Sequence, residues 1–124
     1  MGDKLGHSAP KIFYVNWFRK TADGKWLWPG FGENSRVLKW MCERVEGKAG
    51  AIETPVGLMP SKNDLDLKGL NIKDSEVTEL LSVDAGRWGA EIPEIEEFIA
   101  GFGKRLPARM KVQLEKMSKR LGNA

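Results

Sequence analysis

Cysteine and histidine are almost absent from this sequence of 124 residues, which contains one of each, Cys42 and His7. A single cysteine excludes an internal disulfide and suits a reducing compartment, so we expect a cytoplasmic location. One histidine and one cysteine cannot supply a zinc site of the usual kind. No apolar run approaches the ~18 residues of a membrane helix, and no signal-peptide core follows the first residues. Disulfide scaffolds, zinc domains and membrane proteins are therefore excluded as classes.

An excess of one charge is also lacking, since 20 basic residues face 17 acidic ones for a net charge of +3. This mild bias identifies no partner. The composition, 41% hydrophobic and 30% charged, is that of an ordinary globular domain and not of a disordered tail. We expect residues 1–9 to be a tail or connection and residues 10–124 to form a single domain.

A phosphate-binding loop is missing although glycine is abundant. The Gly-x-Gly pairs at residues 30–32 and 101–103 do not continue into a Gly-Lys-Ser/Thr sequence. The acidic residues Glu94, Glu96 and Glu97 lie on the polar side of a predicted helix, which favours a solvated face over a pair of catalytic acids.

Aromatic residues are plentiful and unevenly placed. Eight of the eleven lie in one short stretch: Phe13, Tyr14, Trp17, Phe18, Trp26, Trp28, Phe31 and Trp40. Two interpretations fit this clustering. The rings form a hydrophobic core, each burying roughly 150–250 Å², or they line a slot for a planar ligand.

Sequence patterns predict the elements of the N-terminal half. The β-branched and aromatic residues 11–18 predict a strand buried on both faces, and residues 19–25 predict a turn with a positive φ at Gly24. Asn34 is a good N-cap for a helix that ends at Gly47. Its predicted buried face consists of Val37, Leu38, Met41, Cys42 and Val45.

The C-terminal half is predicted to be mainly helical. Residues 48–73 form an irregular segment with at most short strands, and helices follow over residues 74–82, after the N-cap Asp84, and from Pro107. Pro93 predicts a kink or break just before it in the middle helix. The fold class is α+β, with short strands from the aromatic N-terminal half followed by four or five helices. The predicted buried stripe of the last helix consists of Met110, Leu114, Met117 and Leu121.

Residues 31–34 join the aromatic loop to a helix N-terminus. Free backbone N–H groups there suit an electron-rich ligand atom, and Gly32 permits close approach. The amide of Asn34 can read a purine edge, with nearby rings stacking on the base. The structural alternative is that Asn34 only caps the helix, Gly32 only forms a turn and Phe31 only packs as a staple. These residues alone leave both interpretations open.

Two longer runs resemble a known family. Residues 10–20 (PKIFYVNWFRK) and 27–38 (LWPGFGENSRVL) closely resemble the C-terminal part of GTP-dependent phosphoenolpyruvate carboxykinase. The Phe-Gly-Glu-Asn block with its upstream Leu-Trp-Pro-Gly is the most specific part. The resemblance spans about residues 10–121. Shorter segments match in the same order at residues 53–57, 64–67, 80–84 and 105–107.

The resemblance implies an enzyme that converts oxaloacetate and GTP to phosphoenolpyruvate, GDP and CO₂ in gluconeogenesis, using Mn²⁺ and a second divalent ion. It implies that Phe18 and Phe31 flank the guanine base and that Asn34 reads its edge. Trp26 stands where the family usually has Phe, which keeps a ring but enlarges it. The implied nucleotide-binding residues are Phe18, Trp26, Phe31, Gly32, Glu33 and Asn34.

The family's phosphate loop, metal ligands, oxaloacetate-binding arginines and mobile lid all lie upstream of the matching region. We therefore expect this chain to be a fragment of the C-terminal nucleotide-binding lobe of a larger enzyme, with no catalytic or metal-binding residue of its own and no activity alone. Its expected partners are a guanine nucleotide and the missing N-terminal part. Self-association would cover an apolar patch exposed by the missing part.

A non-enzymatic interaction module is the alternative function. In that case the basic face of the last helix binds an acidic partner or nucleic acid, and binding falls steeply with salt. That face consists of Arg109, Lys111, Lys116, Lys119 and Arg120.

Overall fold

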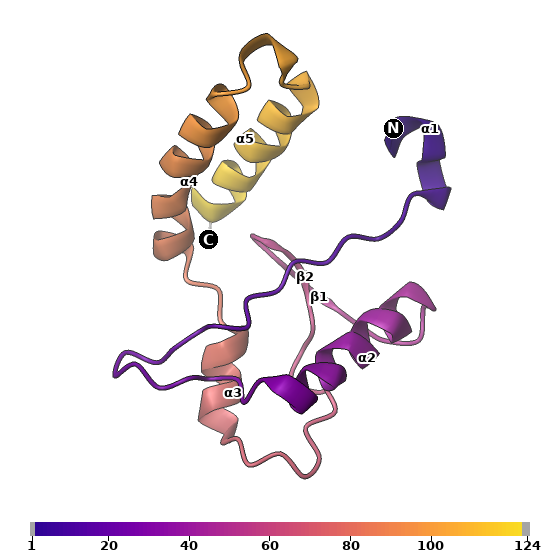
Figure 1. The fold of residues 1–124 in the computed structure, drawn as a ribbon, viewed down its shortest axis with the longest axis vertical. Coiled ribbons are helices and arrows are strands. Elements are labelled where there is room, and N and C mark those ends of the chain that lie inside the picture. The colour runs from indigo at the N-terminus through magenta and orange to yellow at the C-terminus, as the bar shows by residue number, and fades with distance from the viewer. Residues whose placement is uncertain (1, 123–124) are drawn as a thin grey trace. The chain divides into compact units, whose positions relative to one another are not determined.

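The aromatic-rich half of the sequence and the C-terminal helices fold into two separate units (Figure 1). The structure is a computed structural model that describes residues 2–122, so Met1 and Ala124, the outer limits of the expected tail and domain, lie outside the described residues. Unit 1 comprises the described residues of Met1–Ala51 and Pro60–Leu80, and unit 2 those of Ile52–Met59 and Leu81–Ala124.

Unit 1 is built from short helices joined by long irregular segments. Two of these helices, α1 (Gly2–Leu5) and η1 (Gly6–Ser8), occupy the expected tail. Helix α3 (Asp74–Leu81) agrees with the helix predicted over residues 74–82. The elements are α1 (Gly2–Leu5), η1 (Gly6–Ser8), η2 (Phe31–Glu33), α2 (Asn34–Val45) and α3 (Asp74–Leu81).

Large rings form much of the core of unit 1. The side chains of Trp28 and Trp40 are buried, and the ring of Phe13 meets that of Trp40 edge-on with centroids 5.9 Å apart. The Trp40 indole N–H donates a hydrogen bond to the carbonyl of Gly50 at 3.1 Å. Part of the aromatic cluster is therefore core. The other buried residues of unit 1 are Leu27, Leu65 and Val77.

The strand predicted over residues 11–18 is wrong. In the described part of the chain no strand pairs with residues 11–16, and residues 17–18 form a turn. The side chains of Ile12 and Tyr14 are 91% and 88% exposed. Strand propensity reflects packing against cross-strand neighbours, and this segment has none among the described residues.

Helix α2 is present, but its predicted start and buried face need correction. Asn34 is its first residue and not its N-cap, which is Glu33 without a side-chain cap hydrogen bond. The buried residue is Trp40, whereas Cys42 is exposed. The packing of the large indole into the core rotates the buried face away from Cys42. Leu38 and Val45, also predicted to be buried, are exposed.

Unit 2 combines a two-stranded antiparallel sheet with two helices. Strands β1 (Ile52–Thr54) and β2 (Gly57–Met59) pair in the register Ile52↔Met59, Glu53↔Leu58 and Thr54↔Gly57. The α+β class is therefore confirmed. The predicted origin of the strands in the aromatic half is wrong, because the hairpin lies in the segment expected to be irregular with at most short strands.

The helices of unit 2 lie where the sequence patterns predict them, but Met110, predicted to be buried on the last helix, is exposed. Asp84 accepts a hydrogen bond from the backbone N–H of Arg87 at 3.0 Å, which confirms it as the N-cap of α4 (Ala85–Ala100). Helix α4 continues through Pro93 without a break. Helix α4 packs against α5 (Ala108–Gly122), which follows the short helix η3 (Gly103–Arg105). The buried residues of these two long helices are Ile92, Ile99 and Leu121.

Candidate functional site

A tight turn brings Phe18 and Trp26 together. Lys20 and Trp26 form an antiparallel bridge, and the N–H of Leu27 donates to the carbonyl of Arg19 at 3.0 Å. The chain reverses at Gly24, whose φ of +84° confirms the predicted turn. Residues on either side of this turn therefore become neighbours.

The two rings meet edge-on and stay partly open to solvent. The centroids of Phe18 and Trp26 are 5.9 Å apart with 64° between the planes, and the side chains are 72% and 50% exposed, respectively. The ammonium of Lys20 lies 4.0 Å from the centroid of the Trp26 ring, a cation–π contact. The rings are thus adjacent without being stacked face to face.

Phe31 presents its ring to water from a strained backbone. It is 96% exposed and has a φ of +45°, directly after Gly30 with a φ of +79°. Positive φ is rare for a bulky residue and costs on the order of 1–3 kcal/mol. In the described part of the chain Phe31 makes no ring contact. A ring kept in this state is available for stacking on a ligand, and the alternative in which Phe31 only packs as a staple does not fit its exposure.

Ion pairs and hydrogen bonds hold the loop that carries Phe31. The Glu33 carboxylate accepts a hydrogen bond from Arg36 Nε at 2.5 Å. Arg36 Nη1 also donates to the carbonyl of Asp66 at 2.6 Å, which ties the loop to the segment before α3. The Ser35 hydroxyl donates to the Gly32 carbonyl at 2.6 Å. These contacts fix the backbone between Gly32 and α2.

Asn34 is held from the core side. Its Oδ1 accepts a hydrogen bond from the indole N–H of Trp28 at 2.9 Å, and Trp28 is only 4% exposed. The amide of Asn34 therefore contacts a buried partner and does not cap its own helix.

The structure places the six predicted residues in two groups. Phe18 and Trp26 are in contact across the turn, while Phe31, Gly32 and Glu33 form η2 and Asn34 begins α2. Their role in nucleotide binding stays a prediction.

Sequence reasoning missed three supporting residues: Lys20, Trp28 and Arg36. The pairing of Lys20 with Trp26 follows from the predicted turn, because the two residues flank it. The Trp28–Asn34 contact has no comparable signal, since a separation of six residues in an irregular loop predicts no side-chain geometry.

The carboxylates of Glu76 and Asp64, both in unit 1, have pKa values below their ordinary range. The hydrogen bond from Lys25 Nζ at 2.8 Å is the main cause for Glu76. Hydrogen bonds from Ser61, through its side chain first and then its backbone N–H, lower the pKa of Asp64. Both carboxylates hold local structure and lie outside the loop of residues 31–34.

No metal-binding cluster is found in the described residues: they contain no group of three or more His, Cys, Asp or Glu side chains that could hold an ion. The residues present therefore do not fit the Mn²⁺ that the resemblance implies. Between residues 2 and 122, no helix is long and apolar enough to cross a membrane.

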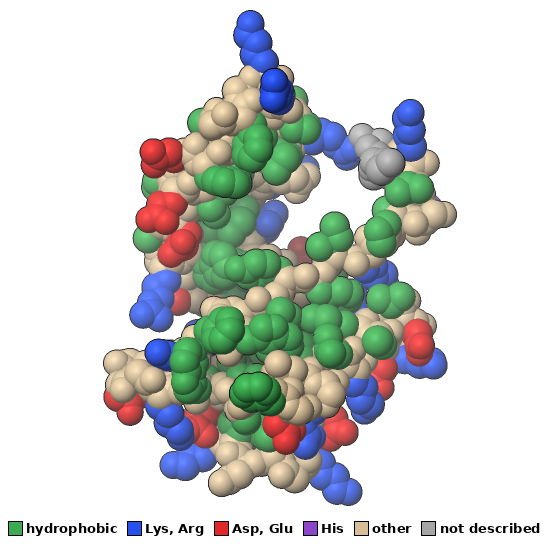
Figure 2. Space-filling view, viewed as in Figure 1, with side chains coloured by type: hydrophobic (Ala, Val, Ile, Leu, Met, Phe, Trp, Pro, Cys, Tyr) green, Lys and Arg blue, Asp and Glu red, His purple; other side chains and the backbone are tan. Residues whose placement is uncertain are grey.

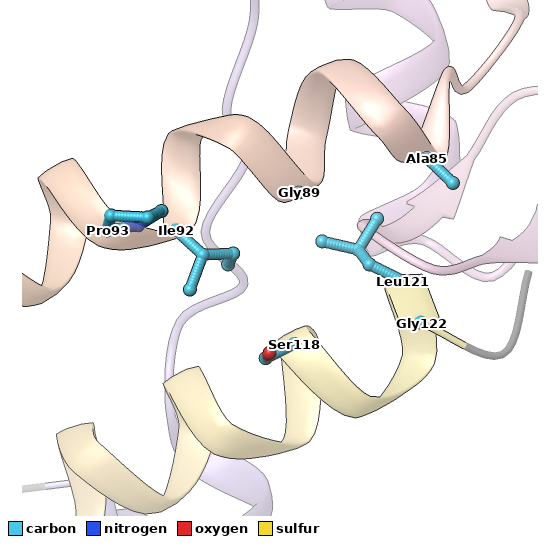
Figure 3. Close-up of a pocket in the computed structure, with 7 residues that line it drawn as sticks. All are labelled: Ala85, Gly89, Ile92, Pro93, Ser118, Leu121 and Gly122. Carbon is cyan, nitrogen blue, oxygen red and sulfur yellow. The ribbon is translucent and has the colours of Figure 1, made fainter.

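A pocket of about 320 Å³ lies between α4 and α5 (Figure 3). Ile92 and Leu121 point toward one another across it, and the Ser118 hydroxyl supplies the polar side-chain group of its described lining. Binding pockets usually combine apolar walls with several convergent polar groups, so this lining offers little for orienting a ligand. The six predicted nucleotide-binding residues lie outside that lining.

The basic residues of α5 are exposed, as predicted for a solvated or anion-binding face. One of them has a structural role, because Arg120 Nε donates to the carbonyl of Pro55 at 2.9 Å and so connects α5 to the β1–β2 turn.

The model of the family described as the phosphoenolpyruvate carboxykinase C-terminal P-loop domain matches residues 1–120. The chain belongs to this family, which confirms the resemblance carried by residues 10–38.

The similar proteins are phosphoenolpyruvate carboxykinases (GTP). The protein of Renibacterium salmoninarum is 54% identical over 113 residues, which cover 91% of this chain and 19% of that protein. The protein of Corynebacterium efficiens is 46% identical over 98% of this chain, and that of Neocallimastix frontalis is 49% identical over 98%. The chain spans about a fifth of the length of these curated relatives.

Proposed function

We propose that this chain is the guanine-binding C-terminal portion of a GTP-dependent phosphoenolpyruvate carboxykinase. The parent reaction converts oxaloacetate and GTP to phosphoenolpyruvate, GDP and CO₂. The observation that carries the proposal is the solvent-exposed ring of Phe31, held on a positive-φ backbone beside a helix N-terminus. Residues 10–124 act as one domain of the lobe, with residues 1–9 as the connection, and the exposed Cys42 suits a reducing cytoplasm.

The base is bound by the six residues of the loop and turn. Phe18, Trp26 and Phe31 supply stacking surfaces, each worth roughly 1–3 kcal/mol by analogy with nucleic-acid bases. Gly32 allows the backbone to approach the base, and Glu33 is fixed by Arg36. Asn34 reads the purine edge.

The 124-residue chain does not catalyse the reaction by itself. Phosphoryl transfer depends on positioned phosphates and on metal electrostatics, and the sequence contains no Gly-Lys-Ser/Thr loop. Its partner in catalysis is the polypeptide that supplies the phosphate loop, the Mn²⁺ and second-metal ligands and the oxaloacetate site. GTP- and Mn²⁺-dependent turnover by the purified chain would contradict this.

Intrinsic tryptophan fluorescence tests the binding function directly. Titration with GTP should change the emission at nucleotide concentrations on the order of 1 mM, because the triphosphate contacts are missing, whereas ATP should have little effect. The Trp26→Phe variant identifies the reporting ring and keeps an aromatic side chain. No change with either nucleotide at about 10 mM would refute the proposal.

Salt dependence and a second variant separate this site from the basic face of α5. Asn34→Ala should abolish the response to GTP, and Lys116→Ala, on the exposed face of α5, should leave it unchanged. Binding that falls steeply with salt and is insensitive to Asn34→Ala would support the interaction-module alternative instead.

A further inference from the structure

The contact between Trp28 and Asn34 fixes which way the Asn34 amide faces. An indole N–H is a donor only, so the atom 2.9 Å from it must be the amide oxygen and not the nitrogen. The oxygen of Asn34 is therefore turned toward Trp28, and the two N–H donors on Nδ2 are turned away from it.

This orientation is resistant to reversal. Trp28 is 4% exposed and belongs to the core of unit 1, so its ring cannot follow a rotating amide. A flipped Asn34 would place NH₂ against the indole N–H and leave a buried donor without a partner, which is unfavourable. Asn34 also begins α2, which limits the movement of its backbone.

A donor-only Asn34 distinguishes between purines. An Asn side chain pairs with adenine through both amide atoms, accepting from the N6 amino group while donating to N7. On the edge that carries O6 and N7, guanine presents two neighbouring acceptors and therefore needs only donors there. An amide whose oxygen already accepts from Trp28 can satisfy this guanine edge with its N–H donors, whereas the bidentate adenine pair would need the same oxygen to accept a second hydrogen bond in a fixed direction.

We propose that Trp28 is a positioning residue that sets nucleotide specificity, by holding Asn34 as a donor toward a 6-oxopurine and against a 6-aminopurine. This inference rests on the proposed guanine-binding function. It deepens that function by naming the purine position that is read, and it assigns a role to a residue that does not itself touch the base.

The test is a comparison of dissociation constants for GDP, IDP and ADP, measured by NMR titration of the 124-residue chain. IDP has the 6-oxo group of guanine without the 2-amino group, so it should bind nearly as well as GDP, and ADP should bind more weakly. Trp28→Phe removes the indole donor and keeps an aromatic ring. It should reduce the GDP-to-ADP preference by about fivefold or more, on the scale of one misread base contact.

Trp40→Phe is the matched control. Trp40 is also buried and also donates through its indole N–H, but to the carbonyl of Gly50. This variant should leave the nucleotide preference unchanged, whatever its effect on stability. A loss of preference in both variants would show that unit 1 responds to core damage in general and would overturn the assignment to Trp28.

Asn34→Asp decides the question if Trp28→Phe does not fold. The carboxylate still accepts from Trp28 but offers no N–H donor, so GDP and IDP binding should fall more than ADP binding. An unmodified chain with no preference for GDP over ADP refutes the proposed function and this inference with it. If the unmodified chain prefers GDP and the Trp28 and Asn34 variants keep that preference, only the inference is overturned.

Discussion

Phe31 combines two features that do not contribute to folding. Its ring is almost wholly in water, so it gains little from burial, and its positive φ strains the backbone. Gly30, with a φ of +79°, shows that the turn itself needs the left-handed region. The proposed stacking of Phe31 on a nucleobase would give this exposed ring a role that folding does not give it.

Two substitutions separate folding from binding at Phe31. Phe31→Gly relieves the φ strain but adds freedom to the unfolded chain, so stability should be unchanged or rise by up to about 1 kcal/mol. Phe31→Ala should have little effect on stability, because the ring is exposed. Both should weaken GTP binding. Urea unfolding gives the stability, and a loss of more than about 2 kcal/mol in Phe31→Ala would show that the ring is structural.

At the scale of single residues the sequence predicts candidates but not contacts. The Phe-Gly-Glu-Asn block is enough to identify Phe31 and Asn34 as candidates. The partner of Asn34 could not be predicted, because a Trp28 side chain in an irregular loop has no periodicity to orient it. The contact of Arg36 with Asp66 could not be predicted either, because the two residues lie 30 positions apart in the sequence. The contact of Lys20 with Trp26 could have been inferred from the predicted turn, which brings the two residues together.

An ion pair links helix α3 to the turn before Trp26. Lys25 Nζ lies 2.8 Å from Glu76 Oε1, while Glu76 Oε2 accepts from the backbone N–H of Lys73 at 2.8 Å. These contacts join an element predicted from its capping pattern to the turn that positions Trp26.

The Lys25–Glu76 contact makes the stability of unit 1 sensitive to acid. The hydrogen bond from Lys25 lowers the pKa of Glu76. Ionised Glu76 therefore stabilises the folded state above the ordinary Glu range, and this contribution is lost as the pH falls through the lowered pKa. We predict that the thermal midpoint decreases as the pH is lowered through and below the ordinary Glu range, and that Glu76→Gln makes this decrease smaller. Tryptophan fluorescence is the probe, since four of the five tryptophans lie in unit 1.

The same pair predicts the alkaline behaviour. The pKa of Lys25 is raised by Glu76, so the lysine contribution is complete below the ordinary Lys range and disappears as the pH rises through the raised pKa. Glu96→Gln, on the exposed side of α4, is the control. It should leave the loss of stability at acidic pH and at alkaline pH unchanged. Equal acid sensitivity in Glu76→Gln and the unmodified chain would contradict this account.

Helices were predictable as elements and strands were not. The Asp84 cap and the spacing of Ile92 and Ile99 are local signals, and α4 follows both. Residues 11–18 carry strong strand propensity, but a strand needs a partner, and the described chain supplies none. The hairpin at Ile52–Met59 pairs through strands too short to show a clear alternation in the sequence.

At the scale of the whole molecule, unit 1 exposes several large apolar side chains. Figure 2 shows hydrophobic side chains gathered around the extended N-terminal segment. Ile12 and Tyr14 are both exposed there, on an extended backbone with no paired strand among the described residues. An unpaired, apolar edge of this kind favours association.

We predict that the isolated chain self-associates through this edge. Tyr14→Lys should shift the molar mass measured by light scattering toward that of a monomer, because an exposed lysine blocks edge pairing. Leu58→Lys introduces the same charge at an exposed position of β2 and should leave the measured molar mass unchanged. A monodisperse monomer over a wide range of concentrations would contradict the prediction.

Family membership was predictable from the sequence because it rests on contiguous motifs. Residues 27–38 suggested the family, and they lie within the residues 1–120 that the family model matches. The division into two units was not predicted. This division depends on which apolar clusters pack against one another. The order of motifs along the chain does not specify that packing.

The most direct test of the guanine-binding account is an amide-resolved NMR titration of the chain with GDP and with ADP. The account predicts that GDP shifts the resonances of Phe31, Gly32, Glu33 and Asn34 and the indole signal of Trp26, while ADP leaves them nearly unchanged. Shifts confined to α5, or identical shifts with both nucleotides, would contradict it.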